Sequence, residues 1–370
     1  METMQNRYTH TCRGRQGVRA RQTSTERNRK PIFSAKGASL LSIAGMIMLQ
    51  TAWIAPGSGP VKPAAAEVTA PTPSVQVADE TPEAPADAVQ PTGHIVFPAY
   101  DPNKKTWDLH ITGADGTGRA LLWEYASQPS FSPAGNQLAF RSEHPSHLGL
   151  AALDMNTREL RQLTRFAEDA RPKWSREIAS LLIFSSQRQP DRRSRLYGLI
   201  AEVPLDWEYA VNNKPIYGDF PAWLPDNRMV YAGCVQGQCG LILADGDGSN
   251  PRALTTNPDD KAPAVSPDGE WIAYMSQNEG NWDLYLIQID NGTPVPLTAT
   301  PGNEGPPEWS PDGNYIGFVS NQHGELAIRT VVFDPVDGKV SEPSKLIDLT
   351  DVPPEGWPWL EGHIAWGQLN

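Results

Sequence analysis

The sequence predicts an all-β fold, a six-bladed β-propeller made of four-stranded antiparallel blades. A strand of the pattern x-apolar-apolar-aromatic occurs six times in the last 278 residues, and successive copies are 43, 44, 47, 43 and 44 residues apart. A repeat of this length fits one four-stranded blade. The six copies, called the first to the sixth repeat below, are His94–Ala99, Gln137–Ser142, Leu181–Ser186, Arg228–Gly233, Trp271–Ser276 and Tyr315–Ser320.

A second motif precedes five of these strands, and its fullest form is Pro-Glu-Trp-Ser-Pro-Asp-Gly at 307–313. Its last four residues predict a tight turn, because Pro fixes the second turn position, Asp bonds its own backbone and Gly tolerates a positive φ. The turn joins an inner strand, which in most copies carries Trp or Phe, to the strand of the first motif. We expect these Trp residues in the core between blades. Apolar stretches such as Trp282–Asp290 and Arg252–Thr255 supply the third and fourth strands.

Together these motifs resemble the repeats of the periplasmic TolB propeller family over residues 93–370. The resemblance is strongest in the repeats whose inner strands start near Phe220, Ala262 and Gly305. It is weakest over 172–219, where Arg176 stands in place of the turn proline and 206–219 is an insertion. The resemblance implies a binding protein of the cell envelope.

The two ends of the repeat region predict how the ring closes. The first repeat has no preceding Trp strand, whereas the chain ends in Gly362–Gly367, a Trp strand without a repeat of its own. A C-terminal strand that pairs with the first repeat would complete six blades. It would also remove the exposed sheet edges of an open array.

Charge separates the N-terminal region from the rest of the chain. Residues 1–36 carry nine Lys and Arg against two Glu, a charge of +7, so the remaining residues sum to −19 within a total of −12. Residues 37–55 hold no charge and are long enough to cross a bilayer as a helix. Because basic flanks stay in the cytoplasm, we expect a cytoplasmic arm (1–36), a single-pass transmembrane anchor (37–55) and a propeller outside the cytoplasm.

A cleaved signal helix is the alternative for 37–55. Cleavage would follow Ala66, where Ala64 and Ala66 are small, and would leave a secreted or periplasmic protein. Residues 56–92 hold eight Pro, eight Ala, five acids and no aromatic residue, a composition typical of a disordered linker. We therefore expect membrane contact through the N-terminal helix and a monomeric propeller at 93–370.

The three cysteines are Cys12, Cys234 and Cys239. The last two flank four residues of a predicted hairpin outside the cytoplasm, where disulfides form, so they are a disulfide candidate. Two packed free thiols are the alternative. Zinc would need two more ligands at suitable spacing, and the sequence places none beside the pair. We expect no metal and no other cofactor.

Common catalytic motifs are absent from the sequence. It contains no Gly-x-Ser-x-Gly elbow, no His-Glu-x-x-His pair and no Gly-x-Gly-x-x-Gly after a strand. The signals of serine hydrolases, zincins and dinucleotide-binding proteins are therefore missing, which disfavours catalysis. We expect no nucleic-acid partner, since the basic arm is explained by membrane topology.

Candidate ligand contacts lie in the connections that enter each repeat, which the resemblance places at one mouth of the channel. Acids predominate three residues before the inner strands, and a ring of them would favour a cationic partner. Acidic loops of an acidic protein are the plainer explanation. Aromatic residues in the same connections would either contact a ligand or cap the loops. The acids are Asp169, Asp219, Asp260, Glu304 and Glu361, and the aromatic residues are Tyr125, Phe166, Trp207, Tyr209, Trp357 and Trp359.

Two functions of different class are compatible with these observations. The first is a non-enzymatic binding module that captures a protein, a peptide or another cell-envelope ligand at the channel face. The second is a propeller enzyme of the glycosidase, lyase or sugar-dehydrogenase type, because a fold does not fix a function. A stand-alone partner domain of a peptidase is a further alternative. The resemblance and the absent catalytic motifs favour the binding module.

Overall fold

The computed structural model describes residues 90–202, 209–210, 215–278, 280–290, 292–324, 326–335, 338–349 and 359–369. All of these belong to the second of two compact units, which begins at Asp87. The expected arm (1–36), the apolar segment (37–55) and most of the linker (56–89) lie outside the described residues. Within the described part, no helix is long and apolar enough to cross a membrane.

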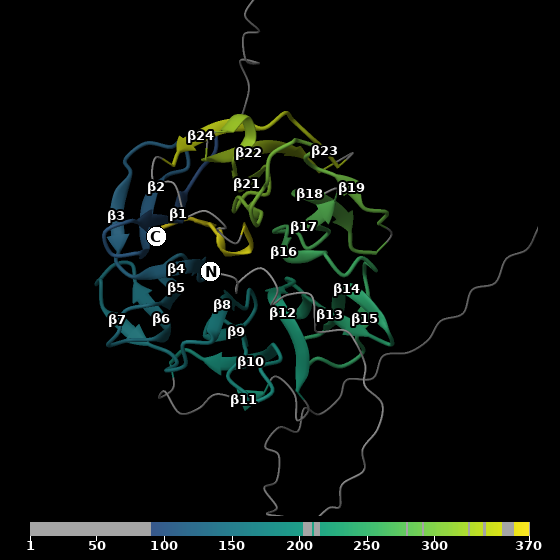
Figure 1. Ribbon diagram of the computed structural model, residues 1–370, viewed down its shortest axis with the longest axis horizontal. Helices are drawn as coiled ribbons and strands as arrows, with labels where there is room; N and C mark the ends of the chain where they lie inside the picture. The colour runs from purple at the N-terminus through teal and green to yellow at the C-terminus, as the bar shows by residue number, and fades with distance from the viewer. Residues whose placement is uncertain are drawn as a thin grey trace, which may run out of the picture. The chain divides into compact units, whose positions relative to one another are not determined.

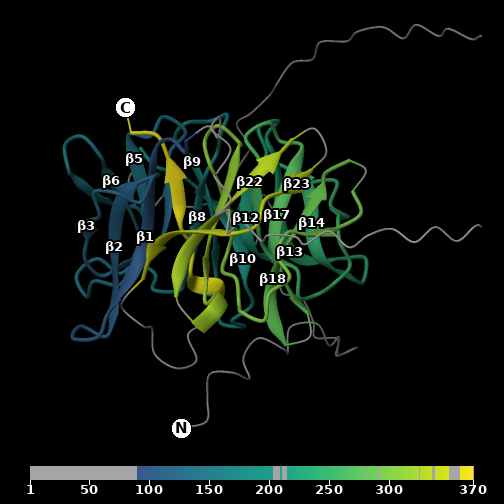
Figure 2. The same ribbon diagram turned by 90° about the horizontal axis from the view of Figure 1, so that it is seen from above.

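The described strands form an all-β propeller, in which antiparallel sheets of mostly four strands surround a common axis (Figures 1 and 2). Two short 3-10 helices, η1 (Gln322–Gly324) and η2 (Trp359–Glu361), accompany the strands. Each sheet starts with an inner strand near the axis and ends with an outer strand at the rim, as Figure 1 shows for β4 to β7.

Three of the sheets contain one repeat each, with the strand order of a simple meander. The second repeat forms β4 (Ala126–Phe131), β5 (Gln137–Ser142), β6 (Gly149–Asp154) and β7 (Leu160–Gln162). The fifth forms β16 (Lys261–Val265), β17 (Trp271–Asn278), β18 (Asn281–Gln288) and β19 (Val295–Pro296). The sixth forms β20 (Glu308–Trp309), β21 (Tyr315–Ser320), β22 (Ala327–Asp334) and β23 (Lys339–Val340), and β24 (Ser344–Asp348) also pairs with β22.

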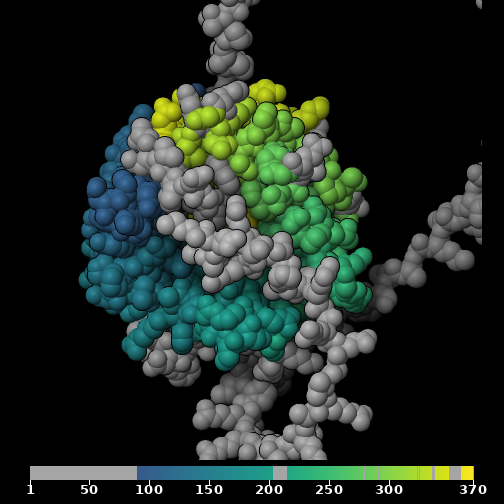
Figure 3. All heavy atoms as spheres, viewed as in Figure 1, coloured from purple at the N-terminus to yellow at the C-terminus, as the bar shows by residue number. Residues whose placement is uncertain are grey.

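The C-terminal strand belongs to the sheet of the first repeat. The order of this sheet is β25 (Ala365–Gly367), β1 (His94–Asp101), β2 (Thr106–Gly113) and β3 (Ala120–Trp123). Trp366 lies opposite Ile95 in the register, and its indole N–H donates to the carbonyl of Thr92 at 2.8 Å. The blue start and the yellow end of the propeller therefore lie side by side (Figure 1). The space-filling view shows blue, teal, green and yellow atoms following one another around the ring (Figure 3).

The third and fourth repeats share one sheet of eight strands. Ile216 and Tyr217, at the start of β12, pair with β10 before the chain enters the next repeat, so hydrogen bonds link the two repeats edge to edge. Because of this link the described residues form five sheets, and the count of six blades stays a prediction. The strands are β8 (Asp169–Trp174), β9 (Leu181–Ser186), β10 (Arg195–Ile200), β11 (Tyr209–Ala210), β12 (Ile216–Trp223), β13 (Arg228–Val235), β14 (Gln238–Asp245) and β15 (Arg252–Ala253).

The core lies between neighbouring sheets, where the aromatic residues of the repeats are buried. The predicted core position of the inner-strand tryptophans is confirmed, since Trp174, Trp223, Trp309 and Trp366 are at most 5% exposed. The indole N–H of Trp174 donates to the Ser130 carbonyl of the preceding inner strand at 3.2 Å. Trp309 likewise donates its indole N–H to the Ala264 carbonyl at 3.0 Å, so the polar atoms of these buried indoles find partners on neighbouring segments. The indole nitrogen of Trp223 has no hydrogen-bond partner among the described residues.

Candidate binding site at the centre of the ring

β-Bulges turn one residue of several inner strands out of the regular pleat. Gln128, Arg171, Phe220 and Ala262 each precede a proline and have φ values of 55°, 57°, 51° and 51°. The pairing register with the following strand shifts at each of these places. A bulge re-aims the side chain at its extra residue, and three of the four side chains meet partners from other repeats at the centre.

Arg171 is the hub of a polar group that we call the central cluster, which comprises Arg171, Gln128, Asp219, Phe220 and Glu361. The guanidinium contacts Glu361 with 2.7 Å between Nη2 and Oε1, and Asp219 with 3.2 Å between Nη1 and Oδ1. It also lies 4.0 Å from the ring centroid of Phe220. Gln128 accepts the Arg171 backbone N–H at 2.7 Å and donates its amide to Glu361. The cluster therefore ties the second, third and fourth repeats to the C-terminal segment.

Two further contacts cross the ring. Lys173 and Glu308 join the third and sixth repeats, with 2.7 Å between Nζ and Oε2. The rings of Phe220 and His363 stack with centroids 5.8 Å apart and join the fourth repeat to the C-terminal segment. Lys173 lies on β8 and Glu308 on β20, the strand that pairs with β21. Figure 1 shows β8 and β21 on opposite sides of the axis, so the ion pair crosses the centre of the ring.

His363 is buried in this centre and is uncharged at neutral pH. Its exposed fraction is 8%. Burial, followed by the positive charges of Lys173 and Arg171, holds its pKa well below the usual value for histidine. Its Nε2 has no hydrogen-bond partner among the described residues. The imidazole thus acts mainly as an uncharged ring packed against Phe220.

Arg176 links the third repeat to the fifth. The inner strand β8 runs from Asp169 to Trp174, and Arg176 follows at the position of the turn proline. Its guanidinium donates to the carbonyls of Val265 and Ser266 in the fifth repeat, at 2.8 and 2.9 Å. The third repeat, which departs most from the motif, therefore supplies three cations that reach into other repeats.

Three of the predicted acids are buried inside their own connections. Asp169, Asp260 and Glu304 have exposed fractions of 0%, 3% and 0%. Burial raises the pKa of Asp260 and of Glu304, against the opposing effect of hydrogen bonds from hydroxyl groups. A ligand in solvent does not reach these three side chains in this conformation. The expected ring of exposed carboxylates is therefore not formed by them, whereas Asp219 and Glu361 do come together around Arg171.

Two of the buried acids, Glu304 and Asp260, belong to a hydrogen-bonded arrangement that recurs between repeats, which we call the Thr–acid–Ser unit. In its complete form, Thr298 and Ser320 each donate to Glu304, at 3.2 Å. Side chains of Thr255 and Ser276 likewise bond Asp260. The Thr hydroxyl also accepts a backbone N–H of the third strand at 2.9 Å, in the pairs Thr164 with Leu150, Thr255 with Leu241, and Thr298 with Leu284. The unit explains why acids recur in these connections without a ligand.

Of the predicted aromatic residues, the structure describes the side chains of Phe166 and Tyr125, which have different partners. Phe166 is 46% exposed, and the Arg188 guanidinium lies 4.5 Å from its ring centroid. Tyr125 contacts His144 edge-to-face, with ring centroids 5.2 Å apart. Trp207 and Trp357, and the side chains of Tyr209 and Trp359, lie outside what the structure describes. A ligand role for these residues stays a prediction.

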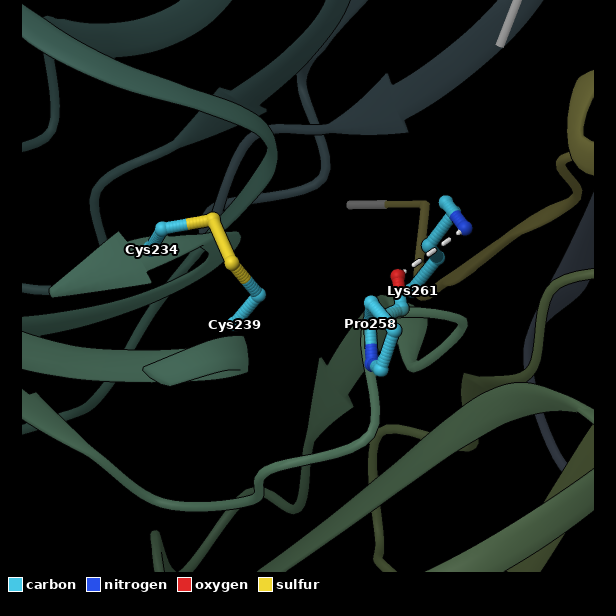
Figure 4. The surroundings of a disulfide bond; sticks show 4 residues. All are labelled: Cys234, Cys239, Pro258 and Lys261. Carbon is cyan, nitrogen blue, oxygen red and sulfur yellow. Dashed lines mark hydrogen bonds between the residues drawn. A yellow bond between two sulfur atoms is a disulfide. The ribbon is translucent and has the colours of Figure 1, made fainter. Parts of the chain in front are cut away.

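A disulfide joins Cys234 and Cys239, whose Cα atoms are 4.1 Å apart (Figure 4). The two residues lie opposite each other in the β13–β14 hairpin, and Gln236 and Gly237 form its turn with φ values of 50° and 84°. Figure 4 also shows Pro258 and Lys261 in the surroundings of the disulfide, where Lys261 Nζ donates to the Pro258 carbonyl at 3.3 Å. The disulfide thus fixes the end of a hairpin that is already closed by its turn.

Sequence reasoning missed the residues that fill the centre, namely Arg171, Lys173, Glu308 and His363. A signal was present in the residues flanking the inner-strand proline, where the third repeat alone reads Arg-Pro-Lys. Across the described residues, no group of three or more His, Cys, Asp or Glu side chains is arranged to hold a metal ion.

Comparison with known proteins agrees with this architecture. The family model of the TolB beta propeller domain matches residues 221–341. The Tol-Pal system protein TolB of Desulfosudis oleivorans is 32% identical over 65 residues, which cover 17% of this chain and 15% of that protein. The chain therefore matches less than a fifth of this relative's length.

Solved structures show the same fold. The TolB structure from Acinetobacter baumannii superposes with a TM-score of 0.57 at 19% identity, over 69% of this chain and 67% of that one. Hydrazine synthase of Kuenenia stuttgartiensis gives a TM-score of 0.56 at 14% identity, over 70% and 46%. Identities this low carry information on the fold alone. The described residues of this chain thus form a TolB-like β-propeller.

Proposed function

We propose that this chain is a non-enzymatic binding module, which captures a protein or peptide of the cell envelope at the face of the ring that holds the central cluster. The observation that carries the proposal is the pair of carboxylates of Asp219 and Glu361. They share the single guanidinium of Arg171 and keep exposed side-chain fractions of 18% and 22%. Because two carboxylates face one cation, the cluster retains negative charge and suits a Lys or Arg of the partner.

The ring that presents this face has six blades in our proposal. The eight-stranded sheet then counts as two blades, β8 to β11 and β12 to β15, which are linked only where the start of β12 pairs with β10. The spacing of the six sequence repeats supports this division. We further propose a monomeric propeller, which needs no cofactor.

Charge removal at the face tests the binding role. We would cross-link the full-length chain to its neighbours in membranes and identify the captured partner. The test variant is the Asp219→Asn/Glu361→Gln double variant. Its control is Asp226→Asn/Glu177→Gln, which removes two charges at exposed positions. The first variant should lose at least tenfold in affinity for that partner and show a weaker salt dependence, while the control stays unchanged. Equal binding by both variants, or robust hydrolase or lyase turnover by the full-length chain, contradicts the proposal.

We also propose that residues 37–55 anchor the chain in the membrane and that 56–92 tether the propeller outside the cytoplasm. The proposal is supported by the charge distribution of the sequence, and by the Tol-Pal system named for the curated relative. External protease should release a fragment close to residues 93–370 from opened cells. A soluble mature protein that begins after Ala66 would establish the cleaved signal instead.

A further inference from the structure

The connection from the first to the second repeat lacks the Thr–acid–Ser unit. Trp123, the last residue of β3, pairs with Leu109 of the first repeat. In the second repeat the equivalent position is held by Thr164, which follows β7 and bonds Leu150. Ala126 pairs with Ser142 in the register that pairs Asp169 with Ser186 in the next repeat. An indole and a methyl group therefore replace the hydroxyl and the carboxylate of the unit.

A groove of about 480 Å³ opens at this connection. Its volume lies within the range of ligand pockets, roughly 300 to 1,000 Å³. Leu121, on its wall, is 53% exposed, which is unusual for a strand leucine in this molecule. Two aromatic and two imidazole rings are also part of the lining. The lining includes Leu121, Trp123, Tyr125, Ser142, His144 and His147.

The wall of the groove is held in place before any ligand arrives. Tyr125 has a left-handed backbone with φ 55°, and its N–H donates to Asp108 Oδ1 at 2.9 Å. Its carbonyl accepts the Glu143 N–H at 2.8 Å. The His144 ring lies 5.6 Å from the His147 ring, and the Ser146 N–H donates to His144 Nδ1 at 3.2 Å. Such preorganisation reduces the ordering cost of binding.

Charge at the rim of the groove is negative. Lys104 Nζ lies 2.6 Å from Glu124 and 2.6 Å from Asp108, and 3.4 Å from Asp101. Three carboxylates thus surround one ammonium group. The Glu124 side chain, which lines the groove, keeps an exposed fraction of 54%. A ligand with a positive charge is complementary to this rim.

An open sheet edge borders the groove. β3 is the last strand of its sheet and is paired on one side only among the described strands. Its four residues, Ala-Leu-Leu-Trp, are all apolar, whereas the outer strands β7 and β15 carry Arg. Exposed edges accept an extended peptide as an additional strand, with neighbouring pockets for its side chains.

We propose that this groove binds an extended peptide segment that pairs with β3, inserts an aromatic or long aliphatic side chain beside Trp123 and Tyr125, and places an adjacent Lys or Arg at Glu124. The surface is formed by residues other than those of the central cluster. It would therefore give the propeller a second peptide contact on its outer wall.

A synthetic peptide tests this assignment on the full-length chain in detergent. The probe is the fluorescent, end-capped hexapeptide Thr-Val-Trp-Lys-Val-Thr, compared with one in which Glu replaces Lys and one in which Pro replaces the first Val. Leu121→Lys places a charge on the exposed groove wall, and Val295→Lys is the matched control on the outer strand β19, where Val295 is 42% exposed. Trp123→Thr introduces at this position the threonine that the Thr–acid–Ser units of other repeats carry.

The Lys peptide should bind the wild-type chain and the Val295→Lys variant alike, and at least tenfold more weakly to Leu121→Lys and Trp123→Thr. The Glu and Pro peptides should also bind at least tenfold more weakly, and hydrogen exchange over 120–123 should slow when the Lys peptide is bound. Failure of the wild-type chain to bind the Lys peptide overturns the proposal. So does equal binding of the three peptides, or equal binding by Leu121→Lys and wild type. Binding of chitotriose in the groove, without binding of the peptide, would also overturn the proposal and would make the groove a saccharide site.

Discussion

Lys173 and Glu308 meet across the centre of the ring with 2.7 Å between Nζ and Oε2, although 135 residues separate them in the chain. Their side chains are 19% and 21% exposed, so solvent screens this ion pair only in part. The contact joins two repeats that share no sheet.

Loss of this ion pair should destabilise the protein. Lys173→Met leaves the Glu308 carboxylate half-buried without its partner, which we expect to lower the free energy of unfolding by about 2 kcal/mol. The Lys173→Met/Glu308→Leu double variant should recover most of that loss, because both charges are then removed. Urea unfolding followed by tryptophan fluorescence measures the effect. Lys345→Met, from an exposed pair, is the control, and a loss in Lys173→Met no larger than in this control would be inconsistent with our account.

His363 should make stability depend on pH. Its pKa is held well below the ordinary value of 6.5 in the folded protein, so the unfolded chain binds the proton first as the pH falls. The contribution of the uncharged His363 to the free energy of unfolding is fully present above about pH 6.5. It is lost as the pH falls, with a slope of up to about 1.4 kcal/mol per pH unit. Unfolding free energies at pH 7.5, 6.5 and 5.5 measure it.

The His363→Gln variant should show a smaller loss of stability between pH 6.5 and 5.5 than the wild-type chain. His147→Gln, at an exposed position, should keep the wild-type slope. Identical slopes in all three proteins would show that another group carries the pH dependence.

The Thr–acid–Ser unit should stabilise the connections it occupies. Thr298→Val leaves the buried N–H of Leu284 and one oxygen of Glu304 without the hydroxyl group. We expect a loss of about 2 kcal/mol in unfolding free energy, because buried polar groups would lose their partner. Thr293→Val, at an exposed position in the turn between β18 and β19, should change the stability by less than about 0.5 kcal/mol. A neutral Thr298→Val would refute a stabilising role.

The disulfide between Cys234 and Cys239 should contribute modestly. It closes a very short loop, so the chain-entropy model gives at most about 2 kcal/mol. A reductant should lower the Tm of the wild-type chain by a few degrees and leave that of the Cys234→Ser/Cys239→Ser variant unchanged. A wild-type Tm that is insensitive to complete reduction would mean that the turn at Gln236 and Gly237 alone fixes this hairpin.

The sequence by itself determined the repeated architecture of this protein. Strand periodicity and the turn chemistry of Ser-Pro-Asp-Gly act over a few residues, and they indicated the strands, the buried tryptophans and the pairing of the C-terminal strand with β1. The spacing of Cys234 and Cys239 about a two-residue turn is also a local property, and it identified the pair that the structure joins. Interactions over a few residues were sufficient because the same strand and turn pattern recurs in each repeat.

Only the tertiary structure decided which side chains meet at the centre and which acids are buried. Arg171 contacts Glu361, 190 residues away, and this depends on bulges that turn the inner strands and on which repeats face each other across the ring. The same spacing that suggested a ring of exposed carboxylates buries Glu304 instead, where its carboxylate accepts hydrogen bonds from Thr298 and Ser320. A sequence position fixes the radius of a residue in a repeated ring, but the direction and burial of its side chain follow from packing against neighbours that are distant in the chain.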